Sequence, residues 1–160
     1  MGKLKKICLT LVVLALSSSM FAKQISIQIV QRSSGEKASE NAMSIEDNIL
    51  NGLFDSGFIV TNSPAVTSIS EAQDKVLWAD GFGDAYDGSS DYFVQVTLFS
   101  EDPEPSRNYF TRIDMSVVSV SSGNEIKNTS MQAKDAADYE KELRKISASI
   151  ISEIKKAIKA

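Results

Sequence analysis

Hydrophobic residues recur along this chain with two different spacings, every second residue in some segments and every third or fourth residue in others. The order of these segments limits the possible folds more than any other feature. Residues 24–31, QISIQIVQ, alternate apolar and polar side chains, which is the pattern of a strand with one buried face. Residues 39–57 instead repeat apolar side chains every three or four positions, which predicts an amphipathic helix that ends at Gly57. A short strand over residues 58–61 follows directly, and we expect Pro64 to stop it.

A second helix is predicted from residue 70 onward. Ser70 and Gln73 have the spacing of a capping box, in which side chains satisfy free backbone amides at the start of a helix. Glycines weaken the last turns, so we expect the helix to fray or end between Gly81 and Gly88. The strand Tyr92–Phe99 follows, and its apolar residues on both faces indicate a central position in the sheet.

The remaining residues predict a hairpin and a long helix. A turn at residues 122–124 separates a first arm, at about 109–120, from a polar second arm, Glu125–Gln132, which we expect to be an edge strand. Residues 139–158 then repeat apolar side chains at helical spacing. The sequence therefore predicts an α+β fold with a single, mainly antiparallel sheet of four or five strands. About three helices pack against this sheet, in the order β-α-β-α-β-β-β-α.

The N-terminus has the layout of a secretory signal peptide. Three lysines precede an apolar run at residues 7–16, which is too short to span a bilayer comfortably, and small residues lead to Ala22. Cys8 lies at the start of the apolar run, whereas a lipidated cysteine would close it, so we expect no lipid anchor. We therefore predict a signal peptide over residues 1–22 and one domain over residues 23–160. The processed protein would be periplasmic or secreted, with no stable membrane anchor.

The composition of the processed chain excludes several classes of function. Three of the 17 basic residues and none of the 21 acidic residues lie in the signal peptide, so the remaining net charge is 14 − 21 = −7. A nucleic-acid binder needs a basic face, so nucleic acid is not an expected partner. Removal of Cys8 leaves neither cysteine nor histidine. Thiolate and imidazole ligation of metals and the usual nucleophilic triads are thereby excluded, and we predict no cofactor.

Four aspartates with glycines between them form the stretch that most resembles a metal site: Asp80, Asp84, Asp87 and Asp91. A calcium loop of the EF-hand type needs glycine at its sixth position and glutamate at its twelfth. Counted from Asp80, these positions hold alanine and aspartate, so the spacing does not match. We interpret the aspartates as turn residues where a helix unwinds. A weak calcium-binding structural role is kept as an alternative.

A carboxylate-dependent enzyme acting on envelope polymers is a second alternative. Glu101, Asp102 and Glu104 could supply the paired carboxylates that glycoside hydrolysis uses. That chemistry needs a concave cleft, whereas this short proline-containing loop is expected to form a convex tip between two strands. We therefore predict no catalytic residue and no enzyme.

The sequence offers two surfaces for contact with a partner. One is an aromatic cluster at the joint between the second helix and the third strand, which either packs into the core or lines a hydrophobic groove. The other is the polar edge strand Glu125–Gln132, to which a partner could add a strand. The predicted partner-binding residues are Trp78, Phe82, Tyr86, Tyr92, Glu125 and Lys127.

The order of elements resembles a small α+β domain of envelope proteins. The resemblance is carried by ISIQIV, by NILNGLFDSGFIV, in which a helix ends in Gly-Phe and enters a strand, by DYFVQVTLF and by the closing helix. It is similar to the penicillin-binding-protein activator lipoproteins, to the curli-secretion channel family and to the N-terminal domain of the Tol translocation β-propeller protein. The chain lacks both a lipidation cysteine and an insert long enough for a pore hairpin, so a secretion channel is not expected.

The resemblance implies an exported, soluble accessory or binding protein of a bacterial cell envelope. Such a protein acts through protein–protein contact without catalysis. Its partner would be an unidentified envelope protein, and a homo-oligomer is a further possibility.

Overall fold

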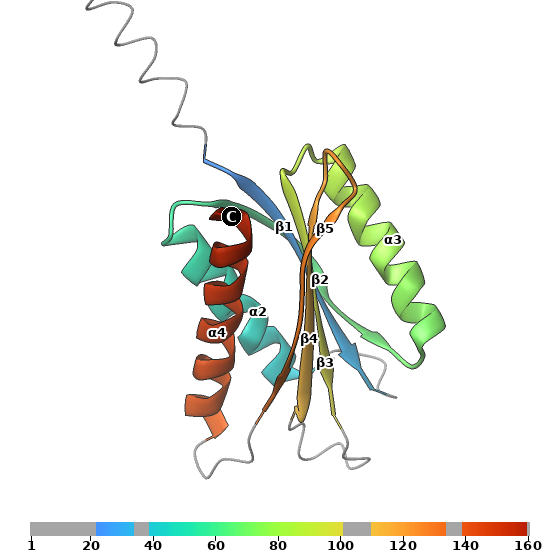
Figure 1. Ribbon diagram of the computed structural model, residues 1–160. Helices are drawn as coiled ribbons and strands as arrows, with labels where there is room; N and C mark the ends of the chain where they lie inside the picture. The colour runs from blue at the N-terminus through green and yellow to red at the C-terminus, as the bar shows by residue number, and fades with distance from the viewer. Residues whose placement is uncertain (1–21, 34–38, 101–109, 134–138, 160) are drawn as a thin grey trace, which may run out of the picture.

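The computed structural model describes residues 22–33, 39–100, 110–133 and 139–159 (Figure 1). The predicted signal peptide up to residue 21 and the acidic loop 101–104 lie outside the described residues, so both remain predictions. The elements are β1 (Gln24–Arg32), α2 (Glu40–Phe54), β2 (Ile59–Ser68), α3 (Glu71–Asp87), β3 (Tyr92–Phe99), β4 (Arg112–Ser119), β5 (Glu125–Gln132) and α4 (Tyr139–Lys159). This order, and the α+β class with five strands and three helices, are confirmed.

The five strands form one sheet in the order β2-β1-β3-β4-β5. Strand β1 runs parallel to both β2 and β3, whereas the pairs β3–β4 and β4–β5 are antiparallel. The sheet is therefore mixed, and not mainly antiparallel as predicted. The physical reason is that α2 and α3 are crossover helices, which return the chain to the end of the sheet where the preceding strand began. The central position of β3 and the edge position of β5 are as predicted.

Strand β2 is longer than the four residues predicted and continues through Pro64. Its register along β1 shifts: Ser63 lies opposite Gln28, and Val66 lies opposite Val30. Two residues of β2, Pro64 among them, therefore face one residue of β1, as in a β-bulge. Proline has no N–H to donate to the ladder, and an edge strand with a bulge tolerates that loss.

Helices cover both faces of the sheet (Figure 1). Helices α2 and α4 lie side by side on one face, and α3 lies on the opposite face. The larger core fills the space under α2 and α4, and Ile27, Ile49 and Ile150 are among its fully buried side chains. Helices α2 and α4 approach closely at Gly52, where an added Cβ would lie 2.4 Å from Cδ1 of Ile151. Burial of apolar side chains in this core is the main source of stability for a chain without disulfides.

Candidate protein-binding surface

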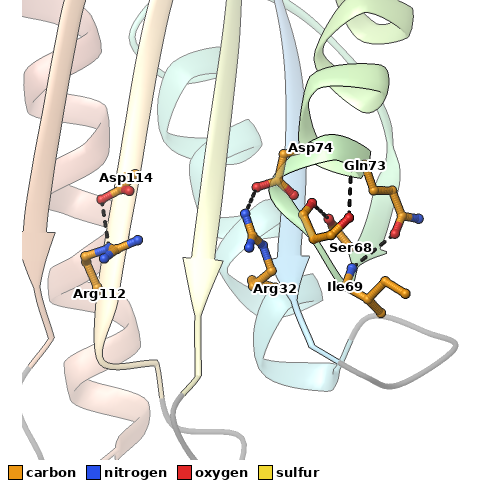
Figure 2. A network of polar contacts seen from close by, with 8 residues as sticks. Arg32, Ser68, Ile69, Gln73, Asp74, Arg112 and Asp114 are labelled. Carbon is orange, nitrogen blue, oxygen red and sulfur yellow. Dashed lines mark hydrogen bonds and ion pairs between the residues drawn. The ribbon is translucent and has the colours of Figure 1, made fainter.

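Helix α3 begins and ends as its sequence predicts. The Ser70 hydroxyl accepts a hydrogen bond from the Gln73 amide at 3.2 Å. The Gln73 side chain accepts one from the Ile69 amide at 3.1 Å (Figure 2). The capping box is thus confirmed, although its return bond reaches Ile69 and not Ser70. The helix continues through both internal glycines to Asp87 and ends at Gly88, inside the predicted interval.

The inner face of α3 packs an aromatic cluster against the sheet. The rings of Trp78 and Phe82 stack with centroids 5.2 Å apart, and each meets Phe93 of β3 edge to face, at 6.0 and 6.2 Å. Gly81 lets the helix come close to the sheet, because an added Cβ would lie 2.9 Å from Cζ of Phe93 and from Cδ of Gln28. Trp78 and Phe82 are predicted partner-binding residues, with core packing as the alternative. In the structure they pack against the core.

The outer face of α3 is also apolar. Six residues follow one another at intervals of three or four positions; the first lies just before the N-cap Ser70, and the other five lie opposite Gly81 on the helix. They are Ile69, Ala72, Val76, Ala79, Gly83 and Tyr86, and we name this set the α3 stripe. Its large members are exposed: Ile69 by 72%, Val76 by 58% and Tyr86 by 65%. A helix that packs on a sheet normally carries polar residues on its outer face, so the α3 stripe is the main candidate surface for binding.

Aspartates border the α3 stripe on one side. Asp80 and Asp87 adjoin it, Asp84 lies nearer the sheet, and no ion pair among the described residues includes any of the three. Asp91 lies apart, just before β3, where a carboxylate oxygen accepts a hydrogen bond from the Gln24 amide at 2.8 Å. Within the described ranges, no group of three or more acidic side chains is placed to hold a metal ion. The first three aspartates are helical, and are not the turn residues that the sequence suggested. Weak calcium binding remains an untested alternative.

The remaining predicted partner-binding residues lie away from the α3 stripe. The Tyr92 hydroxyl accepts a hydrogen bond from Nζ of Lys23 at 3.2 Å, and that ammonium group lies 5.3 Å from the centre of the Tyr92 ring. Glu125 accepts a hydrogen bond from the side chain of Asn128 at 3.0 Å. Lys127 pairs with a carboxylate of α4. Of the six predicted residues, the structure thus brings Tyr86 alone into the stripe.

The α4 partner of Lys127 is Glu153. Its carboxylate lies 2.6 Å from Nζ of Lys156 and 3.3 Å from Nζ of Lys127. The hydrogen bond from Lys156, followed by that from Lys127, lowers the pKa of Glu153 below its usual range. This three-residue group joins α4 to the edge strand β5.

An ion pair between Arg32 and Asp74 joins the first turn of α3 to the sheet. Figure 2 shows Arg32 of β1 paired with Asp74 of α3, and Arg112 paired with Asp114 along β4. Both guanidinium groups lie over the ring of Phe99, at 5.4 Å for Arg32 and 3.7 Å for Arg112. Each arginine faces a carboxylate, so the local charge is balanced. Such partly exposed ion pairs contribute about 0–1 kcal/mol each. The Arg32–Asp74 pair joins α3 to the sheet, whereas Arg112 and Asp114 both lie on β4.

The described helices include none with the length and apolar content needed to cross a bilayer.

Comparisons with known proteins relate the chain to one family. The model of a family described as "Uncharacterised protein" matches residues 24–159. No curated protein matches the sequence.

Chains of similar fold occur among solved structures. Lipoprotein GNA1162 from Neisseria meningitidis is 12% identical with a TM-score of 0.48, and the match covers 85% of this chain and 99% of that one. TolB from Acinetobacter baumannii is 14% identical with a TM-score of 0.46, over 86% of this chain and 28% of TolB. The C-terminal domain of LpoB from Salmonella enterica is 14% identical with a TM-score of 0.44, over 79% of this chain and 94% of that domain. TolB and LpoB, which belong to two of the groups that the sequence resembles, are thus among the structural matches.

Proposed function

This chain belongs to the family described as "Uncharacterised protein", and from that premise we propose that it is an exported accessory protein of a bacterial cell envelope. It acts by docking other proteins and not by catalysis. The observation that carries the proposal is the α3 stripe, an apolar face that the fold leaves uncovered although the opposite face of the same helix already packs on the sheet. Contiguous exposed apolar residues with a polar border are typical of protein-binding surfaces.

The composition of the α3 stripe suits a packed interface. Ile69, Val76 and Tyr86 project large side chains, and Tyr86 adds a hydroxyl that can remain hydrated at the rim. The small residues between them allow another backbone to approach closely. An area of this kind excludes water along a line of about 21 Å, the length of helix between Ala72 and Tyr86, and Ile69 extends it beyond the N-terminus of the helix.

Affinity capture with matched variants tests the proposal. The processed chain, exported with its own leader and immobilised, is exposed to envelope extract beside two variants. Val76→Glu places a charge in the α3 stripe, and Met43→Glu places the same charge on exposed α2. We expect the free energy of unfolding of each variant to lie within about 0.5 kcal/mol of the parent's, because both sites are exposed.

The expected result is that the parent and Met43→Glu retain the same protein, whereas Val76→Glu loses it. Equal retention by both variants would exclude the α3 stripe as the docking surface. An absence of retained protein from the parent as well as the variants would contradict the docking function.

A further inference from the structure

Helix α4 carries an open groove on its outer surface, away from the sheet. Its volume is about 310 Å³. The floor includes Ala148 and part of Ile151, and the sides are polar or cationic. The lining residues are Ala148, Ile151, Ser152, Lys155, Lys156 and Lys159. This groove, which we name the α4 groove, combines apolar contact area with three ammonium groups, of which Nζ of Lys156 pairs with Glu153 and Nζ of Lys155 donates a hydrogen bond to the Ser56 hydroxyl at 3.1 Å.

Helix α3 has the opposite charge at its C-terminal end. Asp80, Asp84 and Asp87 lie in its second half, and its last turn holds no basic residue. Negative charge near the C-terminus of a helix opposes the macrodipole and disfavours the isolated helix. Within the described part of the chain, none of the three aspartates forms an ion pair. A cationic partner beside the α3 stripe would offset this unfavourable interaction with the helix dipole.

We propose that the occupant of the α4 groove is the α3 stripe of a second copy of this chain. This inference rests on the proposed function, because it assigns a partner to the same stripe. The charges match when the two helices run in the same direction, since the aspartates of α3 and the lysines of α4 both lie in C-terminal halves. Asp80 and Asp87 are separated by about 10 Å along the helix axis, and Ala148 and Lys159 by about 16 Å. The acidic border therefore fits within the length of the basic groove.

The proposed contact is head-to-tail. Helices α3 and α4 lie on opposite faces of the sheet (Figure 1), so one copy offers α3 to a neighbour while its own α4 groove stays open to another. An interface made of two different surfaces does not end at a dimer, and it either closes into a ring or continues as a chain. The assembly is thus expected to exceed two copies as the protein concentration rises.

Charge reversal with a mixing step tests this inference. In one variant, Asp80→Lys with Asp87→Lys makes the border of α3 basic. In a second, Lys155→Glu with Lys159→Glu makes the α4 groove acidic. Asp47→Lys, on exposed α2, is the control. The mass of each processed chain is measured by sedimentation and by light scattering over a range of concentrations.

The parent and the control are expected to associate. Salt at about 1 M is expected to weaken this association, because it shortens the Debye length to about 3 Å. In each double variant alone, the Kd of association should rise at least about tenfold, because like charges then face each other. An equimolar mixture of the two double variants should associate again, since each then meets a neighbour of opposite charge. Lysine at positions 80 and 87 also complements the helix dipole, so loss of association there is not a loss of folding.

A parent that is monomeric at all concentrations would overturn the inference, as would association that neither double variant changes or that mixing fails to restore. The proposed function is judged separately. If the parent is monomeric but Val76→Glu still abolishes capture from envelope extract, the second copy is excluded and docking to another protein stands. If capture is also unaffected, both proposals fail.

Discussion

Replacing Gly81 by alanine tests whether α3 lies as close to the sheet as the structure places it. Within a helix, alanine is favoured over glycine by about 1 kcal/mol. Gly83, two residues further along α3, has nothing within 4 Å of an added Cβ. Gly83→Ala should therefore raise the free energy of unfolding by about 1 kcal/mol and serves as the matched control.

At Gly81 the same methyl group would clash with neighbouring side chains. It would lie 2.9 Å from Cζ of Phe93 and from Cδ of Gln28. Phe93 is held between two other rings, and Gln28 accepts a buried hydrogen bond from Gln95 at 2.8 Å, so neither moves freely. Overpacking of this kind costs about 1–3 kcal/mol. After the gain in helix propensity, Gly81→Ala should lower the free energy of unfolding by about 0–2 kcal/mol, and the two variants should differ by about 1–3 kcal/mol.

Urea unfolding of the processed chain measures this difference. The single tryptophan, Trp78, lies in the cluster beside Gly81, so its fluorescence reports on the packing of α3. The sign of the effect is the informative quantity, because the two substitutions are chemically identical. If both variants were stabilised equally, the close approach of α3 at Gly81 would be refuted.

Three further expectations concern the core, a strand end and pH. Ile150→Ala should lower the free energy of unfolding by about 2–5 kcal/mol in thermal or urea denaturation, because Ile150 is fully buried, and a cost below 1 kcal/mol would contradict that burial. Asp91→Ala should cost about 1–2 kcal/mol by the same assay, since it removes the acceptor of the Gln24 amide, and an unchanged midpoint would exclude that bond. The lowered pKa of Glu153 contributes stability above the carboxyl's ordinary pKa, and this contribution is lost as the pH falls through the lowered value. Denaturation of the parent and of Glu153→Gln at pH 7 and in acid should therefore give a difference that shrinks in acid, and a constant difference would contradict the lowered pKa.

Local periodicity predicted most of the fold because burial in this protein follows simple repeats. The isoleucines of β1 alternate, and the apolar residues of α4 repeat at helical spacing, so the faces that meet the larger core are readable from the sequence. The prediction of a single buried face is wrong for β1, because its polar side chains, such as Gln28, are buried as well on the face that α3 covers. The pairing of strands depends on the sheet as a whole, and no local pattern distinguishes a parallel neighbour from an antiparallel one. The extension of β2 through Pro64 was missed for a related reason: proline ends most strands but is tolerated at a bulged edge.

The candidate surface was predicted less well than the fold. The aromatic residues of α3 attracted attention as a possible groove, yet Trp78 and Phe82 pack inward. The outer stripe was overlooked because alanine and glycine, which make up half of it, are weak signals of hydrophobicity. The available signal was that Ile69, Val76 and Tyr86 lie seven and ten residues apart, which are close to two and three helical turns. It could be recognised only after Gly81 had shown which face of the helix meets the sheet.

Site-specific photo-cross-linking in living cells tests the central claim, that the outer face of α3 is a contact surface. A photoreactive residue is placed in turn at Val76, at Tyr86 and, as an exposed control on α2, at Met43. The account predicts discrete protein adducts from positions 76 and 86 and none from position 43. Adducts missing at both α3 positions, or equally abundant at position 43, would contradict it.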